Sequence, residues 1–338
     1  MTQERSRALV LGGGGVTGIA WEVGVLAGLA ESGFDVRDWD LVVGTSAGAI
    51  AGARLLGDAD LAGWYATMAA PWSREDDQPV RDVGGRVAAA AMRLGRRRLL
   101  NWTVQAWFTA LAIETLVRQR AVRGKRASVP HPTPVAGLRP FREADWMAAR
   151  AGAFSLAART STEEVYLAAV SSYLGPVTAW PDALVVTMVD ALDGRAVAAD
   201  ARSGVPLVRA VAASCAVPAL MPPVMIGGRP YVDGGVVSQS HLVLAAGYDD
   251  VLVIAPIDLG SLASEAADLR GSGSRVRVIQ PSVEAAESIG RDVRVLDMAR
   301  RSRSARLGRE EGRQAAMLLV AEMPGRRGRE ALPRTAAG

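Results

Sequence analysis

A serine between glycines, Ser46 in the sequence GTSAG (Gly44–Gly48), is the residue of this chain best suited to act as a nucleophile. In a G-x-S-x-G sequence the serine occupies a sharp turn between a strand and a helix, and the flanking glycines let the backbone pass close to its neighbours. The turn exposes the hydroxyl at a helix N-terminus, where free N–H groups favour developing negative charge. Gly, Ala and Ser are also common in non-catalytic turns, so the motif has to be judged by its context.

A glycine-rich segment upstream, GGGGVTG (Gly12–Gly18), could present bare backbone N–H groups to an anion. Its glycines satisfy the G-x-G-x-x-G pattern of dinucleotide-binding loops, which is weakly diagnostic alone. That interpretation needs an acidic residue at the end of the next strand, whereas Asp38 and Asp40 precede the apolar run Leu41–Val43. The alternative is an oxyanion hole for acyl transfer, in which one backbone donor is worth about 3–4 kcal/mol.

A general base for the serine is offered by Asp233, within the segment RPYVDGGVVSQS (Arg229–Ser240). A short strand is predicted to end at Val232, and the two glycines after the aspartate permit a turn that would aim the carboxylate inward. An Asp-Gly pair also occurs at Asp193, where it is typical of a hairpin turn. Spacing alone does not choose between the two aspartates.

The elements that must position these residues are apolar strands followed by helices. Strands are predicted at Ala8–Leu11 and Leu41–Val43, directly before the glycine loop and the serine, and each leads into a segment with helical spacing of its apolar residues. Two more core strands are predicted at Val251–Pro256 and Val276–Gln280, with a polar connection over Asp258–Gly273. Helices are predicted over 141–158 and 284–316.

In this order, the three motifs resemble the pattern of the patatin-like phospholipase family. The oxyanion loop corresponds to Gly12–Gly18, G-x-S-x-G to Gly44–Gly48, and the downstream D-G-[GA] to DGG at Asp233–Gly235. The segment Ser203–Gly235 resembles the one that leads to the aspartate in bacterial members. The resemblance runs from about residue 8 to residue 256 and is thin between about 70 and 183. It implies an α/β fold of three layers, α/β/α, with a central mostly parallel sheet and a helical insertion.

The resemblance also implies a Ser-Asp catalytic dyad without a histidine, in which Ser46 attacks the acyl carbonyl and Asp233 accepts its proton. The oxyanion hole is then expected among the backbone N–H groups of Gly13, Gly14, Gly15 and Val16. The supporting glycines of the motifs are Gly18, Gly44, Gly48, Gly234 and Gly235. The implied function is a lipid acyl hydrolase of the phospholipase A, lysophospholipase or esterase type, which cleaves carboxylic esters through an acyl-enzyme.

Three positions differ from the family pattern. Thr17 stands where the oxyanion loop usually carries Arg or Lys, so this position offers no cation to an anionic head group. His241 and Leu242 stand where bacterial relatives tend to have Asn and Ala. The only histidines are His131 and His241. A Ser-Asp-His triad would need His241, which follows Asp233 by only eight residues, so both histidines are expected to be incidental.

Composition excludes several other classes of protein. Hydrophobic residues make up 49% of the 338 residues, enough for a large core. Cys215 is the only cysteine, which excludes an internal disulfide, and with two histidines we expect no metal and no cofactor. The net charge of +4 comes without a zinc-finger or RNA-binding signature, so no nucleic-acid partner is expected. The polar N-terminus argues against a signal peptide, and the uncharged runs Leu99–Ile113 and Ala210–Gly228 make poor membrane spans.

We therefore predict one acyl hydrolase domain over residues 7–320, with a helical insertion at about 70–180 and a flexible basic tail at 324–338. Within the insertion, residues 93–126 place arginine clusters on either side of an aromatic, apolar segment. This pattern fits peripheral contact with an anionic membrane or, equally, a buried helix capped by solvated arginines. The expected location is cytoplasmic, with peripheral membrane contact. Two alternatives stay open, a non-catalytic membrane-associated scaffold with this fold and a nucleotide-binding protein that uses the glycine loop.

Overall fold

Both strand–turn–helix units that carry the motifs form as predicted. The computed structural model describes residues 5–58, 60–72, 137–291 and 293–321. In it β1 (Arg7–Leu11) leads into α1 (Gly15–Glu31), and β2 (Leu41–Thr45) leads into α2 (Ala47–Gly57). The two strands are parallel, with Leu11 beside Gly44. The glycine loop and the serine therefore lie at the same edge of the sheet.

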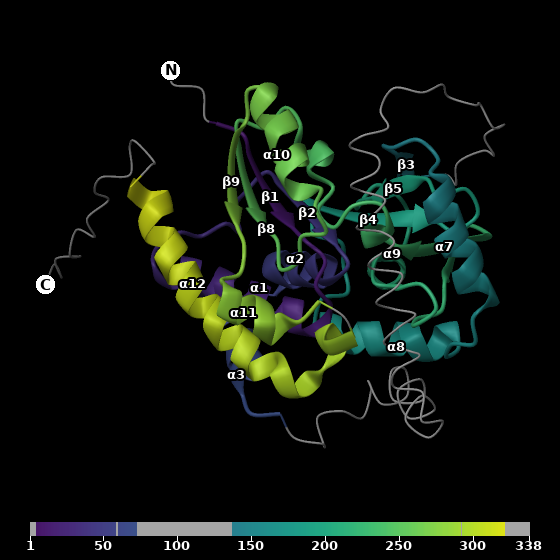
Figure 1. Cartoon of the computed structure of the whole chain (residues 1–338), viewed down its shortest axis with the longest axis horizontal. Helices are drawn as coiled ribbons and strands as arrows, with labels where there is room; N and C mark the ends of the chain where they lie inside the picture. The colour runs from purple at the N-terminus through teal and green to yellow at the C-terminus, as the bar shows by residue number, and fades with distance from the viewer. Residues whose placement is uncertain (1–4, 59, 73–136, 292, 322–338) are drawn as a thin grey trace, which may run out of the picture.

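The described residues form one nine-stranded sheet, in the order β3-β5-β4-β2-β1-β8-β9, with β7 paired to β4 and β6 paired to β7 (Figure 1). The five central strands, from β4 to β9 along this order, are parallel, and the remaining pairs on the β4 side are antiparallel. The other strands are β3 (Arg139–Pro140), β4 (Leu184–Asp190), β5 (Ala196–Ala199), β6 (Val224–Ile226), β7 (Arg229–Asp233), β8 (Asp250–Ile254) and β9 (Arg275–Ile279).

Helices flank this sheet. Besides α1 and α2 they are α3 (Leu61–Ala69), α7 (Trp146–Ala157), α8 (Glu163–Leu174), α9 (Leu207–Ser214), α10 (Leu262–Gly271), α11 (Val283–Ile289) and α12 (Arg301–Ala321). Short 3-10 turns are η3 (Gly234–Val236), η4 (Leu242–Ala245), η5 (Val293–Leu296) and η6 (Met298–Arg300).

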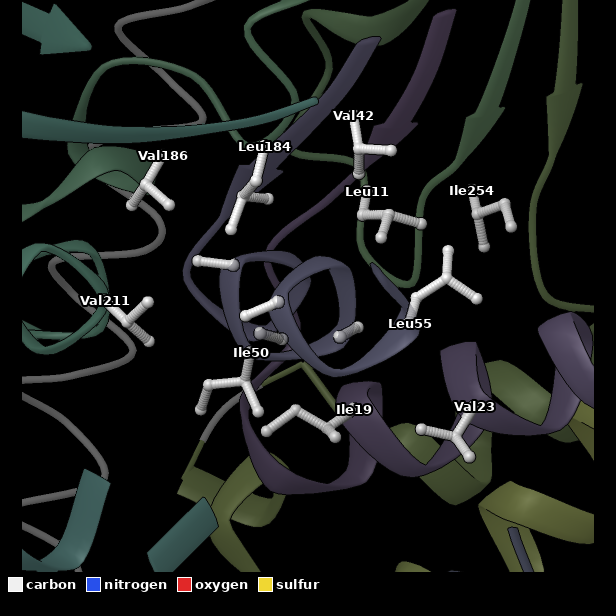
Figure 2. Close-up of a cluster of buried hydrophobic side chains, with 14 of the residues drawn as sticks. Leu11, Ile19, Val23, Val42, Ile50, Leu55, Leu184, Val186, Val211 and Ile254 are labelled. Carbon is white, nitrogen blue, oxygen red and sulfur yellow. The ribbon is translucent and has the colours of Figure 1, made fainter. Parts of the chain in front are cut away.

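The strand side chains alternate between two apolar layers, as the period of two in a strand requires. On β1, Leu9 and Leu11 join the larger cluster with α1, α2 and α9, while Ala8 and Val10 join the smaller cluster with α10 and η4. Figure 2 shows α2 within the larger layer, its Ile50 close to Ile19 of α1 and below the strand side chains. The three-layer arrangement with a central mostly parallel sheet is thus confirmed.

Helices α1 and α12 lie side by side although almost 300 residues separate their starts (Figure 1). Glycines on both helices allow the close approach. A Cβ on Gly24 would lie 2.2 Å from the carbonyl oxygen of Ala305, and one on Gly308 would lie 2.2 Å from that of Trp21. Gly28 and Gly312 make the same kind of contact one turn further along, so the helices run parallel.

One helix was not predicted. The polar connection over 258–273 contains helix α10, because Leu262, Ala266 and Leu269 recur at helical spacing and pack on the sheet. Two predicted helices have different limits. The first begins at Trp146, where the Asp145 side chain caps the helix by accepting backbone hydrogen bonds. The second is divided into α11 and α12 by the turns that follow Gly290.

Candidate active site

Ser46 occupies a strained turn between β2 and α2. Its φ of 53° and ψ of −116° lie in a region that residues with a side chain rarely adopt, at a cost of about 1–3 kcal/mol. The turn is possible because Gly48 lets α2 approach β1: a Cβ there would lie 2.2 Å from the Leu11 carbonyl oxygen. The Gly48 N–H also donates to the Gly12 carbonyl at 3.0 Å, which joins the serine turn to the glycine loop.

Asp233 lies at the end of β7, directly beside the serine. The Ser46 hydroxyl donates to Asp233 Oδ2 at 2.8 Å, and the Gly235 N–H donates to Oδ1 at 2.7 Å. Antiparallel pairing of β7 with β4, with Asp233 beside Met188, brings the carboxylate to this edge. The structure thus separates the two aspartates left open by the sequence, since Asp193 instead lies 3.4 Å from the guanidinium of Arg229.

Burial changes the acidity of this carboxyl group. Asp233 is 5% exposed, and loss of solvation raises its pKa to about 7, against the opposing effect of the hydrogen bonds from the Gly235 N–H and the Ser46 hydroxyl. A base is most effective when its pKa lies near the working pH. The carboxylate can therefore accept a proton from the serine near neutral pH.

The glycine loop offers backbone donors that have no acceptor of their own in the described part of the chain. Gly14 precedes the first turn of α1, and among the described residues the N–H groups of Gly14, Gly15 and Val16 have no acceptor. Gly15 has a φ of +62°, which glycine adopts without strain. The N–H of Gly13 differs from the others, because it already donates to the Gln239 carbonyl at 2.9 Å. Its inclusion among the expected oxyanion donors does not fit this geometry.

Thr17 points its hydroxyl at the C-terminal part of the chain. Its side chain is fully buried, and its hydroxyl lies 2.9 Å from the carbonyl oxygen of Ile289 and 3.2 Å from that of Val295. A hydroxyl can donate to such carbonyls. The position where the family usually carries a cation is therefore occupied here by a hydroxyl that connects α1 to the end of α11 and to η5.

Gln239 and His241, which follow Asp233 in the chain, have roles that sequence reasoning did not find. Gln239 joins two motifs, since its side-chain amide donates to the Gly235 carbonyl at 3.0 Å while its own carbonyl accepts from Gly13. His241, expected to be incidental, is buried with Nε2 at 2.9 Å from the Gly234 carbonyl. Burial lowers the pKa of His241 to about 3, so the ring is neutral and its Nε2–H donates to the turn.

The remaining expectations from the sequence concern a dinucleotide site, a metal site and contact with a membrane. Asp40 accepts a hydrogen bond from the Arg7 N–H at 2.7 Å, at the sheet edge opposite the glycine loop, so the dinucleotide interpretation lacks its acidic residue. In the described part of the chain no group of three His, Cys, Asp or Glu residues could hold a metal ion. No helix of the described ranges is long and apolar enough to cross a bilayer. The proposed membrane segment 93–126, His131 and the tail 324–338 lie outside these ranges.

Two solved structures are similar to this chain at low sequence identity. VipD from Legionella pneumophila aligns with 94% of this chain and 67% of its own at 14% identity, with a TM-score of 0.39. The type III effector ExoU aligns with 93% of this chain and 53% of its own at 14% identity, with a TM-score of 0.32. This chain therefore spans about half the length of ExoU. No curated protein matches.

The family comparison covers all three motifs. The model of the patatin-like phospholipases matches residues 9–245, a range that includes the glycine loop, the serine turn and Asp233. It ends before β8, α10, β9, α11 and α12. With well over half of its 338 residues matched, the chain belongs to the patatin-like phospholipase family.

Proposed function

We propose that this protein hydrolyses carboxylic esters of lipids, with Ser46 as nucleophile and Asp233 as general base. The single observation that carries the proposal is the hydrogen bond of 2.8 Å from the Ser46 hydroxyl to Asp233 Oδ2. A nucleophile and its base within hydrogen-bond reach are the signature of an activated serine. Membership of the patatin-like phospholipase family supports lipid hydrolase activity.

In the acylation step, Ser46 Oγ forms a bond to the carbonyl carbon of the ester while its proton moves to Asp233 Oδ2. The carbonyl oxygen becomes negatively charged and is stabilised by the N–H groups of Gly14, Gly15 and Val16, which have no acceptor of their own among the described residues. The tetrahedral intermediate then collapses. The bond to the leaving alcohol breaks, and the alcohol takes the proton from Asp233.

In the second step, water hydrolyses the acyl-enzyme. Asp233 accepts a proton from the water, whose oxygen attacks the acyl carbon, and the same donors stabilise the second oxyanion. Collapse releases the carboxylic acid and returns the proton to Ser46 Oγ. The described histidine, His241, takes no part in this step, since it donates its Nε2–H to the Gly234 carbonyl and has no hydrogen bond with Ser46 or Asp233.

The test combines a covalent probe with turnover. Wild type, Ser46→Ala and Asp233→Asn are treated with a fluorophosphonate that labels active serines, and p-nitrophenyl esters of increasing chain length are assayed in parallel. We expect the wild type to be labelled and to turn over, and both variants to lose labelling and activity. A folded wild type that is inert with every ester would refute the proposal and favour a non-catalytic scaffold.

A matched control separates loss of chemistry from loss of structure. Ser288 is buried like Ser46, and its hydroxyl lies 2.9 Å from that of Ser304, in α12. Ser288→Ala therefore removes a buried hydroxyl without touching the proposed dyad. It should keep labelling close to the wild-type rate.

Contact with a membrane is a second part of the proposal and depends on the sequence alone. The arginine clusters of residues 93–126 would attract anionic lipid, with about 1 kcal/mol per basic residue near the surface. Flotation with anionic liposomes should recover the wild type, and less of a variant in which Arg96, Arg97 and Arg98 are replaced by Ala. Equal flotation of both proteins at low salt would contradict this part.

A further inference from the structure

Three consecutive residues at the end of α9 contact the backbones of both proposed dyad residues. The Ser46 N–H donates to Ser214 Oγ at 2.8 Å, and the Cys215 thiol donates to the Ser46 carbonyl at 3.1 Å. The Asp233 N–H donates to the Ala216 carbonyl at 3.0 Å. We refer to Ser214–Ala216 as the bridge segment.

The Ser46 N–H needs its partner in the bridge segment, whereas the Ser46 carbonyl also accepts a hydrogen bond from the Ala49 N–H at 3.0 Å. With a φ of 53°, this residue keeps its turn only if its surroundings hold it there. Ser46 is 8% exposed, so a polar group that loses its partner at this position is not readily solvated, at a cost of about 1–3 kcal/mol. The bridge segment supplies a partner on each side of the residue, an acceptor for its N–H and a second donor for its carbonyl.

The two side chains of the bridge segment are suited to these roles. A backbone N–H can only donate, so the Ser214 hydroxyl must accept through a lone pair, and its full burial leaves no water to compete. Burial raises the pKa of the Cys215 thiol, with Asp233 adding to the effect. The thiol therefore stays protonated and can donate to the Ser46 carbonyl.

The bridge segment is itself anchored in the core. The Tyr166 hydroxyl of α8 donates to the Ala212 carbonyl in α9 at 3.0 Å, and both residues are buried. Helix α9 also packs against β4 and β7, the strand that ends at Asp233. Movement of the bridge segment relative to either dyad residue is thus restrained from both sides.

We propose that Ser214 and Cys215 are positioning residues, which hold the backbone of Ser46 in register with that of Asp233 so that Oγ and Oδ2 stay at reacting distance. The proposal rests on the dyad proposed above. A direct Ser-Asp pair has no third side chain between nucleophile and base to absorb an error in spacing. Misplacement by about 1 Å typically lowers the rate about 100-fold, so the backbone contacts matter for kcat more than for substrate binding.

The main test compares Ser214→Ala with Ser214→Thr, which keeps the hydroxyl. We expect Ser214→Ala to lower kcat by about 10- to 100-fold with KM within about twofold, and Ser214→Thr to recover part of kcat. Ser288→Ala, which removes a buried hydroxyl elsewhere, should leave kcat unchanged. A Ser214→Ala protein with kcat within about twofold of the wild type would overturn the proposal, as would equal loss in Ser288→Ala.

Cys215 provides an independent pair of variants. Cys215→Ser keeps a donor for the Ser46 carbonyl and should retain most of kcat, whereas Cys215→Ala should lower kcat several-fold. Equal kcat in these two variants would overturn the assignment to Cys215. Both substitutions leave in place the hydrogen bond from the Ser46 N–H to Ser214 and the one from the Ala49 N–H to the Ser46 carbonyl, so their effects should be smaller than that of Ser214→Ala.

Hydrogen exchange tests the bridge without requiring activity. In the full-length protein, hydrogen–deuterium exchange of the peptide that covers Gly44–Gly48 and contains the Ser46 N–H is measured by mass spectrometry. The proteins compared are wild type, Ser214→Ala and Ser288→Ala. Faster exchange in Ser214→Ala only would support the bridge, and unchanged exchange would overturn it. A wild type that is inert yet shows this difference would refute the proposed hydrolase while retaining the bridge, so the two failures are distinguishable.

Discussion

Replacing Asp233 by Asn should make the protein more stable at alkaline pH while it removes the proposed activity. The carboxyl group is 5% exposed and has a pKa of about 7 in the folded protein, against about 3.9 in an unfolded chain. Because its pKa is higher, the carboxyl group binds its proton more tightly in the folded state than in the unfolded state. Stability therefore falls as the pH rises from about 4 to about 7, and the loss is complete above the folded pKa.

The magnitude follows from the difference between the two pKa values. Each pKa unit corresponds to about 1.4 kcal/mol, so holding the ionised carboxylate in its buried position costs about 4 kcal/mol above pH 7. Asn has nearly the same shape and no charge. It can replace only one of the two acceptor oxygens that Ser46 and Gly235 contact, which costs about 1 kcal/mol. The variant should thus be more stable than wild type by roughly 3 kcal/mol at about pH 8 and slightly less stable at about pH 4.5.

The assay is urea unfolding of both proteins, followed by tryptophan fluorescence at about pH 4.5 and about pH 8. Taking the difference between the proteins cancels titration of groups that the substitution does not affect. Asp190→Asn is the matched control: this aspartate is also buried but lies 2.6 Å from the Arg229 guanidinium, so its loss leaves the cation with only the longer contact of 3.4 Å to Asp193. Asp190→Asn should destabilise at about pH 8, the opposite sign. A difference between wild type and Asp233→Asn that is the same at both pH values would refute the reasoning.

Three further predictions concern the proposed site. The rate of fluorophosphonate labelling should rise as the pH passes through about 7 and level off above it, because Asp233 must be ionised to accept the proton; a rate independent of pH from about 5 to about 9 would contradict this. Gly15→Ala should lower kcat at least tenfold, because the new Cβ would lie 2.8 Å from the Val295 side chain at a φ of +62°. The control is Gly33→Ala, at a φ of +79° with open space around it. It should cost only about 1 kcal/mol of stability and leave kcat unchanged. Thr17→Val, which keeps the shape but loses the donor, should lower the free energy of unfolding by about 1–2 kcal/mol, with Thr17→Ser recovering most of it in the same urea titration.

Local sequence was sufficient to place the loop and the serine turn. The glycines of these segments leave few conformations for a chain that passes from a buried strand into a helix, and Gly48 in particular makes the contact with Leu11 that the motif predicts. The choice between Asp233 and Asp193 was different, because it depends on the pairing of β7 with β4. A strand register across more than 40 residues is set by tertiary packing and not by spacing.

Hydrogen-bond partners that are far apart in the sequence could not be predicted either. The hydroxyl of Thr17 donates to carbonyls more than 270 residues away. Every residue has a backbone carbonyl, so the residue types do not indicate which carbonyl accepts this bond. Ser214 and Cys215 lacked a signal for the same reason, since small polar residues at a helix end are usually caps or turns. Helix α10 was missed because its three buried side chains are separated by polar residues that favour a loop.

The glycine contacts between α1 and α12 also bear on how the protein is made. Helix α1 begins with the residues that offer the free N–H groups, yet its face with Gly24 and Gly28 is covered by a helix that ends at Ala321. On a ribosome, Ser46 and Asp233 emerge long before that helix does. Contacts between such distant segments form late in folding. We therefore expect the nascent chain to stay without hydrolytic activity until α12 has been synthesised and docked, which would spare cellular lipids from a partly made enzyme.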